Sequence, residues 1–408
     1  ALTTFALAAC NSQETDPQTN AETAAPHANA PFTGHLTIAT LFEDGFITAA
    51  ARQFEALHDD VTIDIIVYDN WQTYAQIINT ALMSGGGEDI ISTRNLQWQR
   101  LADAGRLVDL TDKLTFAPGE FYQNVLDAYL YRGRRYVVPL TFGLPVIQIQ
   151  DTVPENQRPS ALTLQGMQDL RSAYPEATFM QSTFMLWGPT AFAYMFFELD
   201  FDRFVDMENR RADINHPDFI ALLESVAALE NLNPTEAGIP TWFQEDFLHS
   251  PAMTMSGIMD FADFIIATGH SGGGVFASTS SLPAINANSP NQALAAEFIQ
   301  FLLSEDVQNS PEVFQTPVNR AAAVRRAHAT VESMRNYSAY TGFTTGIDWD
   351  YNLDVFNRLA DMVTSPGVQD PTISEFVRDE MTRFFDGEVT AQQAAANLQA
   401  RITTYLNE

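Results

Sequence analysis

Residues 71–114, WQTYAQIINTALMSGGGEDIISTRNLQWQRLADAGRLVDLTDKL, decide the fold. From Trp71 to Leu82, apolar side chains recur at three- and four-residue steps, which predicts a helix with one buried face. Three consecutive glycines end this helix, and the isoleucine pair that follows is short enough for a buried strand. A second amphipathic segment comes next. The order helix, strand, helix predicts part of an α/β sheet, whose ligands gather at the carboxyl ends of strands, here residues 92–97.

The segments before this stretch extend the same pattern. Alternating apolar residues at 61–68 predict a strand that turns Val61, Ile63, Ile65 and Val67 inward. A shorter strand at 35–41 and a helix at 49–57 precede it. A strand, a helix and a strand in this order favour a parallel sheet with right-handed crossovers.

Composition limits the class of protein. The 408 residues suffice for two lobes, and 46% of them are apolar, so the chain can bury substantial cores. The net charge of −30, with 21 basic against 51 acidic residues, argues against a nucleic-acid partner, because phosphate contacts need clustered Lys and Arg. The seven histidines are scattered, so we expect no metal site, and we expect no cofactor.

The amino-terminal residues resemble a lipoprotein signal. Residues 1–9 are small and apolar, which is typical of the end of a signal peptide, and LAAC at 7–10 resembles the bacterial lipobox. In that motif the cysteine, here Cys10, is lipidated and becomes the first mature residue. Acyl chains hold a protein to a bilayer without a spanning helix. The alternative is an ordinary free thiol. The polar residues after Cys10 predict a flexible tether.

Several ordered motifs resemble those of the sugar-binding family of extracellular solute-binding proteins of ABC importers, which includes the maltodextrin-binding protein. The resemblance covers most of the chain from Leu36 onward, with Glu88 where the family often has proline. The runs that carry it are YAQIINTALMSG (74–85), LADAGRLVDLT (101–111), GRRYVVPLTFG (133–143), AMTMSGIMDF (252–261), AINANSPN (284–291) and TPVN (316–319).

This resemblance implies an α/β fold of the two-lobed periplasmic-binding-protein type (type II). Each lobe is expected to be a sheet flanked by helices, with three chain crossings between the lobes. The expected division is a signal-peptide remnant at 1–9, a lipidated cysteine and tether at 10–33, lobe 1 at 34–143 plus 275–318, and lobe 2 at 144–274 plus 319–408. Two capping boxes are also expected, Ser289 with Gln292 and Thr390 with Gln393.

Aromatic residues beside polar residues at loop positions indicate a carbohydrate site. Aromatic planes cover the apolar faces of a sugar, and Asp, Glu, Asn and Arg bond its hydroxyls. Matching positions of the family imply the loop after the first strand, Asn95, Asp260 and Phe261. The other candidates are inferred from the residues themselves. The full predicted set is Phe42, Glu43, Trp71, Asn95, Phe142, Trp187, Asp260, Phe261, Trp349 and Tyr351.

The predicted function is capture of a sugar or oligosaccharide between two lobes and its delivery to an ABC transporter permease, without catalysis. Alternatives are a binding protein for another solute, such as a peptide, a polyamine or a sugar acid, and a receptor subunit that only signals. A strongly negative surface would not itself attract an acid. A surface hydrolase is a further alternative, since residues 269–273 fit G-x-S-x-G with Ser271 as nucleophile, and Asp306 and His328 follow in formal order.

The predicted partners are a small-molecule ligand, a membrane permease and the membrane itself through the lipid anchor. The predicted location is extracytoplasmic. The acidic composition favours the outer face of a Gram-positive cell, with the periplasm as the Gram-negative equivalent. A monomer is expected.

Overall fold

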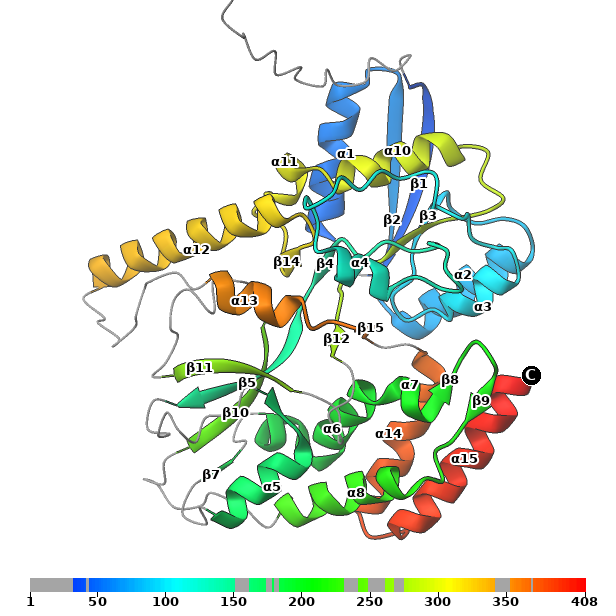
Figure 1. Cartoon of the computed structure of the whole chain (residues 1–408). Coiled ribbons are helices and arrows are strands. Elements are labelled where there is room, and N and C mark those ends of the chain that lie inside the picture. Colours follow the sequence, from blue (N-terminus) through cyan, green and yellow to red (C-terminus); the bar gives the residue numbers. More distant parts are fainter. Residues whose placement is uncertain are drawn as a thin grey trace, which may run out of the picture.

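The computed structural model describes residues 32–41, 44–150, 161–173, 178–179, 183–230, 241–248, 261–267, 275–341, 353–367 and 370–408. These residues form two lobes, which lie one above the other in Figure 1. Each lobe has its own sheet and its own helices, so the expected α/β architecture of two lobes is confirmed.

The first lobe is built on a four-stranded sheet with the order β13-β3-β1-β2. Strands β1, β2 and β3 are parallel, and β13 pairs antiparallel with β3. The strand that completes the sheet therefore comes from a segment far along the chain. The bounds are β1 (Gly34–Leu41), β2 (Val61–Tyr68), β3 (Ile90–Ser92) and β13 (Pro283–Ile285).

Helices cover both faces of this sheet. On one face, Phe54 of α1 packs edge-on against Phe298 of α10, with ring centroids 5.3 Å apart, in a large apolar core. On the other face, Tyr74 and Ile78 of α2 share a second core with Leu101 of α3. The helices of this lobe are α1 (Gly45–Leu57), α2 (Trp71–Met83), α3 (Trp98–Asp103), α4 (Gln123–Ala128), α10 (Gln292–Leu302) and α11 (Glu305–Gln308).

The inward set predicted for the strand at 61–68 is only partly right. Val61 is buried, but Val67 is half exposed. Strand β2 lies at the edge of the sheet. An edge strand has neighbours on one side only, so less of its apolar face is covered there than in a central strand.

The second lobe combines a mixed five-stranded sheet, ordered β6-β11-β5-β10-β7, with a helical layer (Figure 1). Its core is rich in phenylalanine, and Phe197 stacks on Phe204 with the ring planes 7° apart. The strands are β5 (Leu144–Gln150), β6 (Ala161–Leu162), β7 (Thr178–Phe179), β10 (Thr241–Leu248) and β11 (Phe261–Ala267), with the ribbon β8 (Val205–Asp206) and β9 (Arg211–Ala212).

Six helices of the second lobe are described. Helix α6 contains Gly188 with a φ of 74°, followed by Pro189, so its axis is kinked at that point. Their bounds are α5 (Leu164–Ala173), α6 (Thr183–Leu199), α7 (Phe201–Phe204), α8 (Pro217–Glu230), α14 (Pro371–Phe385) and α15 (Ala391–Asn407).

Short paired strands lie where the two lobes meet. The pairs are β4 (Thr141–Phe142) with β14 (Thr316–Pro317), and β12 (Phe276–Ala277) with β15 (Ser365–Pro366). Between them, the N–H groups of Gly143 and Ser278 each donate to the carbonyl of the other residue, at 2.8 and 3.0 Å. Chain passes that are distant in sequence are thus hydrogen-bonded to one another at the waist of the molecule.

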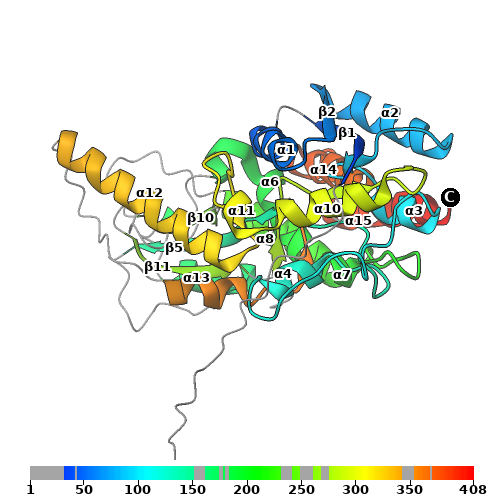
Figure 2. The same ribbon diagram turned by 90° about the horizontal axis from the view of Figure 1, so that it is seen from above.

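Two helices between these passes pack on the first lobe. Helix α12 (Arg320–Thr341) extends away from the body on the side opposite α3, as Figure 2 shows. Phe356 and Leu359 of α13 (Leu353–Ala360) are buried in the first lobe's core. The sequence-based division assigns these helices to lobe 2. Because the apolar side chains of α13 are buried in the first lobe's core, we propose that residues 353–363 belong to lobe 1 and that the third crossing follows them. The other boundaries remain predictions.

Candidate functional site

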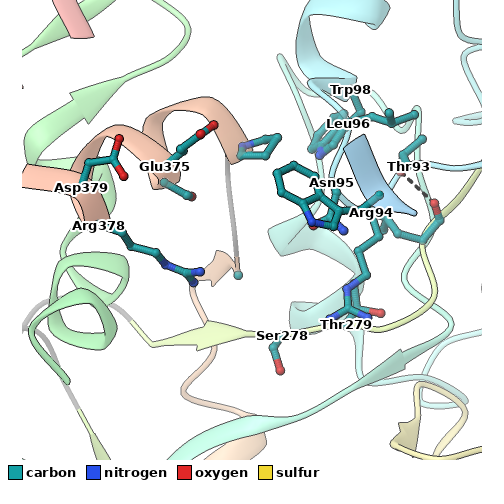
Figure 3. Close-up of a pocket in the computed structure, with 15 residues that line it drawn as sticks. Thr93, Arg94, Asn95, Leu96, Trp98, Ser278, Thr279, Glu375, Arg378 and Asp379 are labelled. Carbon is teal, nitrogen blue, oxygen red and sulfur yellow. Dashed lines mark hydrogen bonds between the residues drawn. The ribbon is translucent and has the colours of Figure 1, made fainter. Parts of the chain in front are cut away.

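A cavity of about 520 Å³ lies between the two lobes, and Figure 3 shows its lining side chains. The volume falls within the range of small-molecule sites, roughly 300–1,000 Å³. The first lobe and the crossing strand contribute Trp71, Thr93, Arg94, Asn95, Leu96, Trp98, Ser278, Thr279 and Leu282. The other wall contributes Gly367, Pro371, Ser374, Glu375, Arg378 and Asp379.

The first wall is the loop that follows β3. Thr93 fixes this loop, because both its N–H and its hydroxyl donate to the carbonyl of Leu282, at 2.8 and 2.7 Å. Asn95 then adopts a left-handed backbone with a φ of 67°, which asparagine tolerates better than most residues. The tight turn presents Arg94 and Asn95 at the carboxyl end of a parallel strand, where α/β sheets place their ligands.

The floor of the cavity is made where two chain passes touch. The N–H of Gly367 donates to the carbonyl of Ala277 at 2.9 Å. A Cβ atom at Gly367 would lie 3.0 Å from the Phe276 ring and 3.1 Å from the Ser278 Cα. Only glycine permits so close an approach, which sets the depth of the floor beside Ser278 and Thr279.

The second wall is the first half of α14. Pro371, Ser374, Glu375, Arg378 and Asp379 recur at three- and four-residue steps and therefore lie on one helix face. Asp370 caps this helix, because its Oδ1 accepts from the N–H groups of Thr372 and Ile373 at 2.9 and 3.0 Å. Its Oδ2 accepts from the Tyr405 hydroxyl at 2.8 Å. The cap ties the start of α14 to α15 and so fixes the wall.

Burial shifts the acidity of this cap. Asp370 is fully buried, and desolvation raises the pKa of its carboxyl above the ordinary value despite hydrogen bonds that lower it. Burial also raises the pKa of the Tyr405 hydroxyl, with a further contribution from the nearby Asp370 charge. Tyr405 therefore stays protonated and acts as a hydrogen-bond donor to the cap.

The cavity contains charged groups of both signs. Arg94 and Arg378 reach it from opposite lobes, and the Arg378 guanidinium lies 4.1 Å from the centroid of the Tyr194 ring. Glu375 is exposed on the same helix face. Asp379 lies 3.8 Å from the Arg401 guanidinium, which partly compensates the charge of the carboxylate. The site can therefore bond hydroxyls and anions, beside the indole of Trp71.

The lobes touch each other beside the cavity. Gln97 donates from Nε2 to the Thr372 hydroxyl at 2.7 Å. Arg100 lies over the Tyr405 ring at 3.9 Å from its centroid and also donates to the Tyr405 carbonyl. Both contacts join α3 and the residue before it to the helices of the second lobe. The end of α15 lies under α3 in Figure 1.

Residues 49–311 match the family model of the bacterial extracellular solute-binding proteins. The chain belongs to this family. Three solved structures illustrate the similarity of fold. The sugar-binding protein MalE from Xanthomonas citri matches with a TM-score of 0.64 at 13% identity, over 92% of this chain and 98% of that one.

An ABC substrate-binding protein from Listeria monocytogenes, solved with cycloalternan, gives a TM-score of 0.60 at 15% identity over 92% and 100% of the two chains. MalE from Bdellovibrio bacteriovorus, solved with maltotriose, gives 0.57 at 14% identity over 92% and 100%. At identities this low, the structural similarity establishes the shared two-lobed fold and nothing further. A search of curated proteins found no match.

The solute-binding chain brings two of the predicted ligand residues together. Trp71 and Asn95 both line the cavity. Phe142 does not, and this prediction is wrong: its ring is fully buried, 5.1 Å from that of Tyr122 and 6.0 Å from that of Phe356. The crossing strand turns this residue into the core, so no ligand can contact it.

The remaining predicted residues are not tested at the level of side chains. The structure describes Trp187 in α6 and Phe261 at the start of β11 by backbone alone. The others lie outside the described residues: Phe42, Glu43, Asp260, Trp349 and Tyr351, with Cys10 and Ser271.

Sequence reasoning missed most of the polar lining. Arg94 could have been found, because it directly precedes Asn95 in the loop that the strand pattern places at the sheet's carboxyl end. Glu375 and Arg378 could not, because helical periodicity shows that α14 is amphipathic but not which of its polar residues face the other lobe. Thr279 lies in a segment without a local signal.

The solute-binding chain has a second cavity of about 480 Å³ behind Trp98. Carboxylates dominate its polar lining, including Asp127, Asp202 and Asp206. Burial and the neighbouring Asp206 raise the pKa of Asp202. Among the described residues, no group of three or more His, Cys, Asp or Glu side chains could hold a metal ion. In the part of the chain that is described, no helix is long and apolar enough to span a membrane.

Proposed function

We propose that this solute-binding protein captures a sugar or oligosaccharide between its lobes and delivers it to an ABC transporter permease. The observation that carries the proposal is the cavity of about 520 Å³ whose two walls come from different lobes. Trp71 supplies an aromatic face at its edge, and Thr279, Asn95 and Glu375 supply hydrogen-bonding groups. Carbohydrate recognition needs both kinds of group in one place.

Closure of the lobes is the physical event that a permease would detect. A ligand that contacts both walls has a higher affinity for the closed arrangement than for an open one, so its binding shifts the population toward closure. The contacts of Gln97 with Thr372 and of Arg100 with Tyr405 lie beside the cavity and would form in the same movement.

The sequence supports the surrounding context. We include in the proposal that Cys10 carries a lipid, that residues 10–33 tether the body to the membrane, and that the protein acts outside the cytoplasm as a monomer. The hydrolase alternative has no structural support in the described residues. Asp306 is exposed and forms an ion pair with the Arg325 guanidinium at 3.7 Å.

A saccharide panel tests the proposal. Thermal unfolding is measured with mono- and oligosaccharides, and hits are followed by titration calorimetry and small-angle scattering. A ligand that binds only the folded chain raises the free energy of unfolding, by about 2.7 kcal/mol at a hundredfold excess over Kd, and so raises the melting temperature. Binding with a smaller radius of gyration supports the proposal. Binding only to peptides or polyamines, or conversion of the ligand to product, contradicts it.

A further inference from the structure

Two arginine side chains from opposite lobes reach the same cavity. Arg94 comes from the loop after β3, and Arg378 comes from the cavity face of α14. In Figure 3 the Arg378 side chain extends into the space above the segment that carries Ser278, just after β12, and Arg94 extends toward Thr279 on the other side of that space. We propose that the saccharide captured here carries an anionic group, a carboxylate or a phosphate, which Arg94 and Arg378 hold jointly. This inference rests on the proposed function.

Arg94 and Arg378 differ from several other arginines of the chain in forming no ion pair with a described residue. The acidic groups outnumber the basic ones by 51 to 21, so carboxylates are plentiful. Arg134, Arg320 and Arg383, for example, each lie within 3.4 Å of a carboxylate oxygen. Neither Arg94 nor Arg378 forms an ion pair with any described residue. Two guanidinium groups in one cavity, neither ion-paired to a described residue, have donors that a ligand can use.

Among the described residues, the carboxylates that line the cavity form no ion pair with Arg94 or Arg378. The Asp379 carboxylate lies 3.8 Å from the Arg401 guanidinium. In Figure 3 the carboxylates of Glu375 and Asp379 lie on the side of α14 away from the end of the Arg378 side chain. The Arg378 guanidinium is instead held over the Tyr194 ring at 4.1 Å. That contact fixes its orientation and leaves its N–H donors available.

The chemistry of guanidinium selects the ligand group. Its planar set of donors matches the paired oxygens of a carboxylate or a phosphate, and such charge-assisted bonds are stronger than bonds to neutral hydroxyls. Asn95, Thr279 and Glu375 line the same cavity and can bond hydroxyl groups. An acid group beside several hydroxyls describes a uronic acid or another acidic sugar, alone or in an oligosaccharide, or a sugar phosphate.

The pair would also couple binding to closure. Closing the cavity brings two positive charges from different lobes toward one another, which costs free energy unless an anion lies between them. An anionic ligand therefore favours the closed arrangement more than a neutral sugar of the same shape does. The net charge of −30 does not oppose this, because at about 0.1 M salt distant surface charges are screened beyond roughly 10 Å.

The test compares matched ligands on the full chain by titration calorimetry. The probes are glucuronate against glucose, galacturonate against galactose, trigalacturonate against maltotriose, and glucose 6-phosphate. The variants are Arg94→Gln and Arg378→Gln, which keep hydrogen-bonding groups but remove the charge. Arg325→Gln, an exposed arginine paired with Glu305, is the control. Arg94 lies in an exposed loop, so its variant keeps the test valid even if Arg378→Gln unfolds.

We expect an anionic probe to bind at least tenfold more tightly than its neutral partner, and each cavity variant to lose roughly tenfold or more of that affinity while the control loses none. The preferred probe then distinguishes carboxylate from phosphate. Neutral probes that bind as tightly as anionic ones, or anionic binding that both variants leave unchanged, overturn this inference and leave the proposed function standing. Binding of no saccharide overturns both.

Discussion

The guanidinium of Arg100, on α3 of the first lobe, lies 3.9 Å from the centroid of the Tyr405 ring, on α15 of the second. It also donates to the Tyr405 carbonyl. Tyr405 in turn donates to Asp370, the cap of the helix that forms one wall of the cavity. Tyr405 thus links a contact between the lobes to α14, the helix that faces the ligand, although Arg100 itself does not line the cavity.

Arg100→Ala should weaken ligand binding without removing a ligand contact. The cation–π contact contributes roughly 0.5–2 kcal/mol to the closed arrangement, so its loss should raise Kd by about two- to thirtyfold. Calorimetry and small-angle scattering of the bound form check this, with Arg325→Ala as a control remote from the lobe contact. An unchanged affinity would show that the contact does not contribute to closure.

Two tryptophans near the cavity should respond differently to truncation. Trp71 is 42% exposed, so Trp71→Ala should reduce ligand affinity by tenfold or more with little change in unfolding free energy. Trp98 is 4% exposed and packs edge-on against Tyr131, so Trp98→Ala should destabilise the fold by about 3–5 kcal/mol. Chemical denaturation and ligand titration of both variants separate the effects. A stable Trp71→Ala protein with full affinity would remove Trp71 from the site.

Gly367→Ala should destabilise the waist between the lobes. The added Cβ would lie 3.0–3.1 Å from Phe276, Ala277 and Ser278, so the two chain passes must separate. Overpacking of this kind costs roughly 1–3 kcal/mol. Gly86→Ala is the matched control, because its nearest neighbour would be 3.8 Å away. Equal melting temperatures for the two variants would contradict the role given to Gly367.

Asp370→Ala should destabilise the protein by about 1–3 kcal/mol, because it removes a helix cap and leaves the Tyr405 hydroxyl without its acceptor. Asp370→Asn retains a capping oxygen and should cost less. Urea unfolding of both variants at neutral pH measures these differences. A variant to alanine as stable as the parent protein would show that the cap is dispensable.

The pH dependence at the same residue has a defined sign. Burial raises the pKa of Asp370 above 3.8, so the folded state binds this proton more tightly than the unfolded state. The contribution of Asp370 to stability is therefore fully present below about pH 3.8 and decreases as the pH rises through the raised value. Unfolding of the parent protein and of Asp370→Asn across this range gives the difference. A relative stability that rises with pH would contradict the assignment.

Local sequence patterns determined the elements of this protein. The capping box of Thr390 and Gln393 is present, because both of its hydrogen bonds form within four residues of chain. The helix, strand and loop from Trp71 to Asn95 follow from periodicity and turn residues, and that loop does line the cavity. The capping box expected at Ser289 is absent. Its hydroxyl donates to Asp89 at 2.6 Å, and α10 begins after Asn291.

Contacts between distant segments decided the rest. Asp89 is 200 residues from Ser289, and no local pattern encodes that competition. The sequence around Phe142 is typical of an aromatic residue that contacts a ligand, yet packing against Tyr122 and Phe356 buries its side chain. The meeting of Arg94 with Arg378 depends on how two lobes are oriented by three chain passes. Hydrophobic periodicity fixes which residues turn away from water, but only the packing of the lobes fixes which polar residues share one cavity.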